Sequence, residues 1–198
     1  GVQPEGTQFQ ISASQLQSNV VFDYEQDSVK LINLEVIDGG GCTYAQTFTV
    51  NIVNVNDTPS AINFVQQNVS DHQQAGSFMG LFSTIDEDFH DAHTYTLVSG
   101  IGSTDNAQFY VSHDSLFNVN QINYIVQNLY HIRARSTDLG GLFVEDTFHI
   151  NVTNVNDAPT DIPLTNDTIQ ENKPVGTLIG VLSVTDLDNP NDSHTITF

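Results

Sequence analysis

The chain carries the stretch NVNDTP at residues 54–59, and almost the same stretch, NVNDAP, returns 100 residues later at residues 154–159. The first copy follows an alternating run in which Phe48, Val50 and Ile52 are apolar, a pattern typical of a half-buried strand. Asn and Asp side chains bond locally to the backbone and offer oxygen ligands, whereas Pro fixes the chain direction and cannot extend a β-ladder. The stretch therefore predicts a stiff, oxygen-rich linker between strand-built modules.

The 100-residue repeat extends well beyond this linker. Matched positions are Phe9 and Phe109, Leu16 and Leu116, Gly40 and Gly140, Ile62 and Ile162, Gly80 and Gly180, Asp86 and Asp186, and, after one inserted residue, His93 and His194. A unit of about 100 residues has the usual size of one domain. Only residues 59–158 form a complete unit. We therefore predict the C-terminal part of a repeat at residues 1–58, a complete repeat at residues 59–158, and the N-terminal part of a repeat at residues 159–198.

The composition limits the classes of partner. The chain has 24 Asp and Glu residues against 4 Lys and Arg residues, and its net charge of −20 repels nucleic acid and anionic lipid. No apolar run is long enough to cross a membrane, so no membrane insertion is expected within this segment. Cys42 is the only cysteine, which excludes an internal disulfide.

Short alternating runs predict an all-β chain. Strands are expected at residues 9–11, 20–22, 31–37, 47–53, 62–65, 78–84, 94–98, 109–111, 123–126, 130–136 and 147–152, and no segment predicts a helix. Within the run 78–84, the even-numbered residues Phe78, Gly80, Phe82 and Thr84 are expected to face the core. About seven short strands per 100 residues are typical of a β-sandwich.

Several acidic motifs recur in one order along the chain. They are Asp-Tyr-Glu at residues 23–25, Asp-x-Gly-Gly at residues 38–41 and 138–141, Asp-x-Asp at residues 86–88 and 186–188, and Glu171 shortly before Gly176. With the two linkers, this order resembles the cadherin repeat, of the bacterial type found in secreted or surface proteins. The resemblance implies tandem Greek-key sandwiches, cadherin- or immunoglobulin-like, of about seven strands each. It also implies extracellular rods whose junctions bind calcium. One departure is that the linkers begin with Asn54 and Asn154, where the family has Asp.

Calcium prefers six to eight oxygen ligands, including carboxylates and amide carbonyls. The candidate ligands are Asp23, Glu25, Asp38, Asn54, Asn56, Asp57, Asp86, Asp88, Asp138, Asn154, Asn156, Asp157, Glu171, Asp186 and Asp188. Asp86 and Asp88 are expected to point the same way if their segment is extended. A solvated acidic loop with Asx turns is the alternative for any single motif.

The second junction is expected to bind fewer or looser ions, because Asn123 and Ile125 stand where the first junction has Asp23 and Glu25. His93 and His194 follow the acidic loops and are expected to be packed or hydrogen-bonded rather than to bind metal.

These patterns predict a calcium-stabilised structural or adhesive segment, located outside the cell or on its surface. It is expected not to be an enzyme, because its carboxylates gather at repeat ends rather than in a pocket. The expected partners are other copies of the same repeat, and a cell-surface protein or polysaccharide is a further candidate. A carbohydrate-binding module of a secreted protein is the alternative function, although the chain has no Trp to stack on a sugar ring.

The partial repeats are expected to complete each other. This would occur either covalently in a longer array or between separate chains in a head-to-tail filament, and a chance boundary is the alternative.

Overall fold

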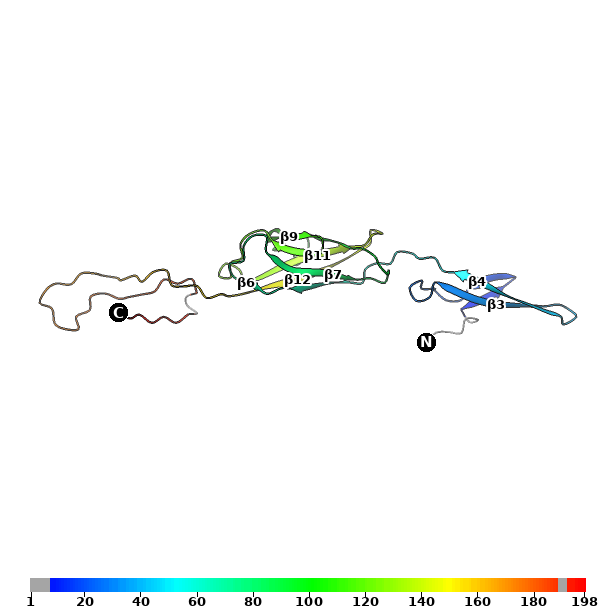
Figure 1. Cartoon of the computed structure of the whole chain (residues 1–198), viewed down its shortest axis with the longest axis horizontal. Coiled ribbons are helices and arrows are strands. Elements are labelled where there is room, and N and C mark those ends of the chain that lie inside the picture. Colours follow the sequence, from blue (N-terminus) through cyan, green and yellow to red (C-terminus); the bar gives the residue numbers. More distant parts are fainter. Residues whose placement is uncertain (1–7, 189–191) are drawn as a thin grey trace. The chain divides into compact units, whose positions relative to one another are not determined.

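The computed structural model describes residues 8–188 and 192–198, and its regular structure is almost entirely β (Figure 1). Backbone contacts divide the chain into two compact units. The first unit holds the described residues up to Ile62 with Thr84–Thr94 and Ser136–Val144, and the second holds Asn63–Ser83, Tyr95–Arg135 and the described residues from Glu145 onward. The predicted organisation into segments 1–58, 59–158 and 159–198 remains a prediction. None of the described helical turns is long or apolar enough to cross a membrane.

Residues 61–153 form a sandwich of two four-stranded sheets. In spatial order, one sheet contains β5 (Ala61–Gln66), β7 (Phe78–Ile85), β10 (Ser115–Asn118) and β9 (Phe109–Ser112). The other contains β6 (Val69–Ser70), β12 (Phe143–Thr153), β11 (Leu129–Thr137) and β8 (Thr94–Leu97). Within residues 61–153, the 3-10 turn η2 covers Asn106–Gln108. The predicted all-β sandwich is therefore confirmed.

The N-terminal segment of the sandwich contributes an edge strand to each of the two sheets. The chain runs along β7 as β5 and then crosses to the second sheet as β6, where Val69 and Ser70 pair in parallel with Val152 and Thr153 of β12. Strand β5 lies close to β7 at Gly80, where a Cβ would lie 2.4 Å from the Phe64 ring and 2.7 Å from the Val65 carbonyl oxygen. The recurrence of glycine at this repeat position has a steric cause.

The core lies between the sheets and follows the period-two pattern of the strands. Along β11, Tyr130, Ile132, Ala134 and Ser136 are buried while the intervening side chains are half-buried. Phe82 of β7 stacks on Tyr95 of the opposite sheet, with 5.5 Å between ring centroids. The largest fully buried apolar side chains among the described residues are Phe82, Met79, Leu116, Ile132, Ile150 and Val69.

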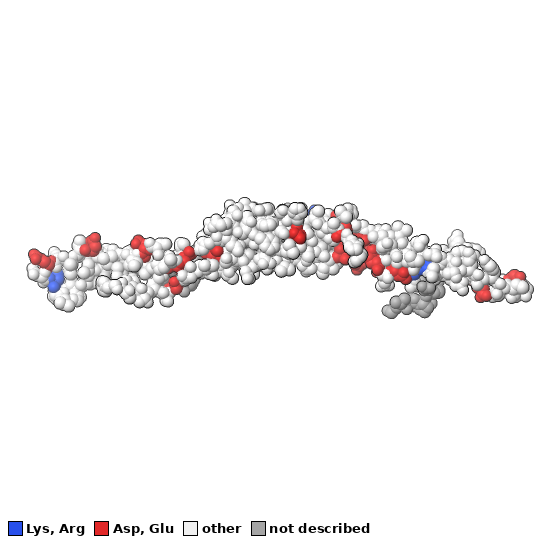
Figure 2. Space-filling model, viewed as in Figure 1, with Lys and Arg blue, Asp and Glu red and all other residues white. Residues whose placement is uncertain are grey.

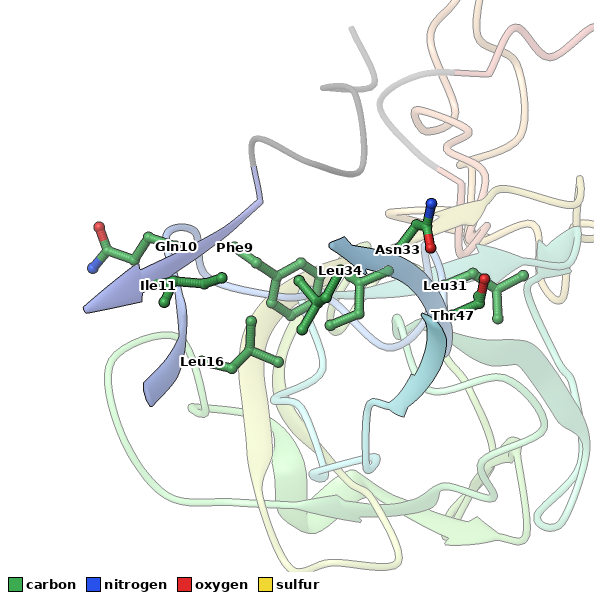
Figure 3. A pocket seen from close by; sticks show the side chains of 9 residues that line it. Phe9, Gln10, Ile11, Leu16, Leu31, Asn33, Leu34 and Thr47 are labelled. Atoms are coloured by element: carbon green, nitrogen blue, oxygen red, sulfur yellow. The ribbon is translucent and has the colours of Figure 1, made fainter. Parts of the chain in front are cut away.

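Residues 8–53 form two hairpins with a poorly covered apolar face. They are β1 (Phe9–Ser12) with β2 (Gln15–Ser18), and β3 (Val29–Ile37) with β4 (Thr43–Asn51). Figure 3 shows the groove of this face, lined by Phe9, Ile11, Leu16, Leu31 and Leu34 among others. Leu16 is 43% exposed, whereas Leu116 at the same repeat position is fully buried.

The described part of residues 159–198 contains two isolated bridges, Asp161 with Thr185 and Leu164 with Leu182. Leu182 is 47% exposed, whereas Phe82 at the same repeat position is only 2% exposed. Both partial repeats therefore expose positions that the central sandwich buries.

Three predictions of local structure are wrong. Residues 20–22 are not a strand, since the pairing of β1 with β2 is closed by the bond from Asn19 N–H to Gln8 O and Val21 is fully exposed. Residues 123–126 form a turn, in which Asn123 Oδ1 accepts the N–H of Val126 at 3.0 Å. Phe78 is exposed, and Met79 is buried instead. A register shift on the partner strand between Leu116 and Phe117 accompanies this change of face.

Candidate metal centre at the linkers

Three carboxylates converge at the first linker. One oxygen each of Glu25, Asp57 and Asp88 lies within 4.8 Å of the others. Figure 2 shows acidic side chains gathered near the ends of the central sandwich, with few basic ones nearby. Burial, and then the charges of Asp88, Asp57 and Asp23, raise the pKa of Glu25. This concentration of negative oxygens fits a hard divalent cation.

The linker is also tied to the turn between β11 and β12. The Asn56 Nδ2 group donates to Asp138 Oδ2 at 2.9 Å, while Asp138 Oδ1 accepts the N–H of Leu142 at 2.9 Å. Burial opposes ionisation of Asp138, but the bonds from Asn56 and from the Leu142 N–H outweigh it and lower the pKa of this carboxyl. A Cβ at Gly140 would lie 2.3 Å from the Asn56 amide, so Asn56 can take this position only above a glycine.

Asp86 and Asp88 lie in a bend and not in an extended segment, so the condition for their side chains to point the same way is not met. The strand β7 ends at Ile85, and the loop turns so that Asp86 Oδ1 accepts the N–H of Asp88 at 3.1 Å. The other oxygen of Asp86 lies 2.9 Å from His93 Nε2. His93 is therefore hydrogen-bonded, as predicted, and Asp86 is bound within its own loop.

The second acidic loop repeats this arrangement. His194 Nε2 lies 2.9 Å from Asp186 Oδ2, and Asp186 Oδ1 accepts the N–H of Asp188 at 2.8 Å. The bond from His194, followed by that from the Asp188 N–H, lowers the pKa of Asp186.

The second linker gathers two carboxylates and one imidazole. His72 Nε2 lies 3.5 Å from Asp157 Oδ1 and 3.8 Å from Asp71 Oδ2. The buried Oδ2 of Asp157 has no hydrogen-bond partner among the described residues. Asp71 and His72 are not among the candidate ligands that the sequence predicts, although Asp71 occupies the repeat position of the candidate Glu171.

The remaining predicted ligands have local roles or lie apart. Asp23 Oδ1 accepts the N–H of Gln26 and so shapes the turn that carries Glu25. Asp38 accepts the N–H groups of Gly40 and Cys42 inside its own turn. Glu171 is exposed, and neither it nor Asp38 belongs to a cluster of metal-binding side chains within residues 8–188 and 192–198.

Both linkers make the same contacts with the loop that follows them. Asn54 Nδ2 donates to Asp88 Oδ1 at 3.0 Å, and Asn154 Nδ2 donates to Asp188 Oδ1 at 2.7 Å. The second oxygen of each Asp accepts the N–H of Asp57 or Asp157. Asn156 Nδ2 donates to the Asp157 carbonyl, as Asn56 does to that of Asp57.

No family model matches the chain. Human protocadherin gamma-A1 is 25% identical over 197 residues, covering 89% of this chain and 20% of that protein. The chain therefore spans one fifth of the length of this curated relative.

Solved structures of protocadherins share the fold. Extracellular cadherin domains 1–4 of protocadherin gamma B7 match 87% of this chain and 44% of their own with a TM-score of 0.69 and 22% identity. The extracellular domain of protocadherin gamma B4 matches 87% of this chain and 28% of its own with a TM-score of 0.66 and 20% identity. Nothing in these similarities singles out the bacterial type. In its fold, the chain therefore resembles the tandem extracellular cadherin domains of these proteins.

Proposed function

We propose that this chain is a calcium-stabilised structural and adhesive segment of an extracellular protein. The observation that carries the proposal is the convergence of Glu25, Asp57 and Asp88 at the linker of a cadherin-like fold. The similar structures are extracellular cadherin domains, which supports a location outside the cell. A structural role without catalysis fits this placement of the carboxylates at the linkers.

The calcium ligands at the first linker would be Glu25, Asp57 and Asp88. Bound calcium would offset the repulsion among these three carboxylates. Asp138 and Asn56 would position the linker beside them through their hydrogen bond. At the second linker, Asp71 and Asp157 offer two carboxylates, and His72 supplies a nitrogen that calcium does not favour. The first linker is therefore the stronger calcium site.

The test is a calcium titration of the chain followed by calorimetry and thermal melting. An ion that binds only the folded state at ~100 times its dissociation constant adds about 2.7 kcal/mol to the free energy of unfolding. We expect the melting temperature to rise with calcium and binding to occur in two unequal steps.

Glu25→Gln should weaken the tighter step, and Glu35→Gln on the exposed face of β3 is the matched control. Identical melting in calcium and in chelator would rule out the proposal.

The second part of the proposal is that the chain associates with other copies of the same repeat. Residues 8–53 and 159–198 carry complementary parts of one repeat, and we propose that a neighbouring unit of the same sequence completes each of them. One similar structure is described as a cis-dimer of protocadherin gamma B7, which supports association between like chains. The similarities do not favour a carbohydrate-binding module.

A further inference from the structure

A set of hydrogen bonds ties the first linker to the following loop without a cation. Asp88 accepts the Asn54 side-chain amide with Oδ1 and the Asp57 backbone N–H with Oδ2, at 3.0 Å and 2.7 Å. Both oxygens of one carboxylate are thus bound by donors of the linker. We call Asn54, Asp57 and Asp88 the first latch, and Asn154, Asp157 and Asp188 the second latch.

The carboxylate that accepts the hydrogen bonds of each latch, Asp88 or Asp188, is itself held in place by bonds within its own loop. In the first loop, the Asp88 N–H donates to Asp86 Oδ1, and Asp86 Oδ2 lies 2.9 Å from His93 Nε2. The side chains of Asp86 and His93 are 4% and 11% exposed, so little solvent competes for these bonds. The same series of contacts, through Asp186 and His194, stands behind Asp188 in the second loop. The latch is therefore a repeated feature with a rigid support.

The amide at residue 54 determines whether this contact is attractive. Its Nδ2 group donates a hydrogen bond to Asp88, whereas a carboxylate at the same place would set two negative oxygens about 3 Å apart and would need a cation between them. Glu25 and Asp57 already add negative charge nearby.

We propose that Asn54 and Asn154 replace one cation at each linker with hydrogen bonds, and so hold the linker to the following loop when calcium is absent. The part of this inference that concerns the number of ions rests on the proposed function. The hydrogen-bonded latch does not.

The test exchanges the amide for a carboxylate in the whole chain. In chelator, Asn54→Asp should lower the melting temperature by about 4 °C or more and speed hydrogen exchange of the Asp57 amide, because the donor is lost and a repulsion is added. In calcium, the same variant should bind one more ion than the parent chain and recover its melting temperature. Asn151→Asp, at an exposed position of β12, adds the same charge away from the first linker and is the matched control.

The measurements in chelator and in calcium distinguish the hydrogen-bonded latch from the proposed calcium function. If Asn54→Asp in chelator melts like the parent and leaves the Asp57 amide equally protected, the latch is refuted whatever calcium does. If neither chain binds calcium but the variant is destabilised in chelator, the latch stands and the proposed calcium function fails. An unchanged ion count in a variant that is destabilised in chelator and does bind calcium would refute the replacement of a cation by Asn54.

Discussion

At the scale of single residues, glycine and asparagine are matched across the linker. Gly140 leaves room for Asn56, whose amide lies where a Cβ would be, and Asn56 in turn binds Asp138. At the equivalent position in the first segment, a Cβ on Gly40 would meet only Asp38 Oδ1 at 3.4 Å, an ordinary contact. The same residue type is thus required sterically at one repeat position and tolerated freely at the other.

This difference predicts opposite outcomes for one substitution. Gly140→Ala should destabilise the chain by about 1–3 kcal/mol, as overpacking does, because Asn56 must leave Asp138. Gly40→Ala should cost much less. Denaturant unfolding of the two variants checks this prediction, and equal effects would show that Asn56 does not rest on Gly140.

At the scale of elements, the equivalent strands β10 and β2 of two repeats have different environments. Strand β10 pairs with β7 and β9 and buries Leu116 completely. Strand β2 carries Leu16 at the same repeat position, pairs with β1, and leaves that side chain 43% exposed. The difference arises because β7 lies beside β10, whereas no equivalent strand lies beside β2 among the described residues.

Truncating Leu116 or Leu16 to Ala measures how much stability the burial of each side chain contributes. Leu116→Ala should cost about 2–5 kcal/mol, since it leaves a cavity in a closed core. Leu16→Ala should cost far less in a dilute chain, as solvent already reaches that side chain. Urea unfolding at low protein concentration makes the comparison. A large loss for Leu16→Ala would show that residues 8–53 are already covered.

At the scale of the whole molecule, the two partial repeats expose surfaces that correspond to different parts of one complete repeat. The groove of residues 8–53 and the segment 159–198 both expose residues whose counterparts pack together in the central sandwich. Apolar surface of this kind is removed from water by association. The net charge of −20 opposes that association, and divalent cations would reduce the repulsion.

We therefore expect the chain to self-associate as its concentration rises, and more strongly in calcium. Leu182→Asp should suppress the association, because Leu182 holds the repeat position of the core residue Phe82. Leu139→Asp places the same charge on an exposed turn and should leave it unchanged. Sedimentation over a range of concentrations is the measurement, and a monomer at every concentration would contradict completion between like chains.

The sequence by itself determined the class of fold and the place of the acidic linkers. Alternation of apolar residues predicted most strands, because a strand that is buried on one face has a period of two. The repeat at a shift of 100 positions placed Asp57 and Asp88 at one junction, and this grouping is present in the structure. Their role as calcium ligands stays a prediction.

Only the tertiary structure decided which atoms meet. It turned Asp86 toward His93, brought Asp71 and His72 to Asp157, and set Asn54 against Asp88. Such contacts depend on loop turns and on pairing between strands far apart in sequence, and neither has a period that can be read along the chain. The exposed Phe78 shows the same limit, because its face changes where the partner strand shifts register between Leu116 and Phe117.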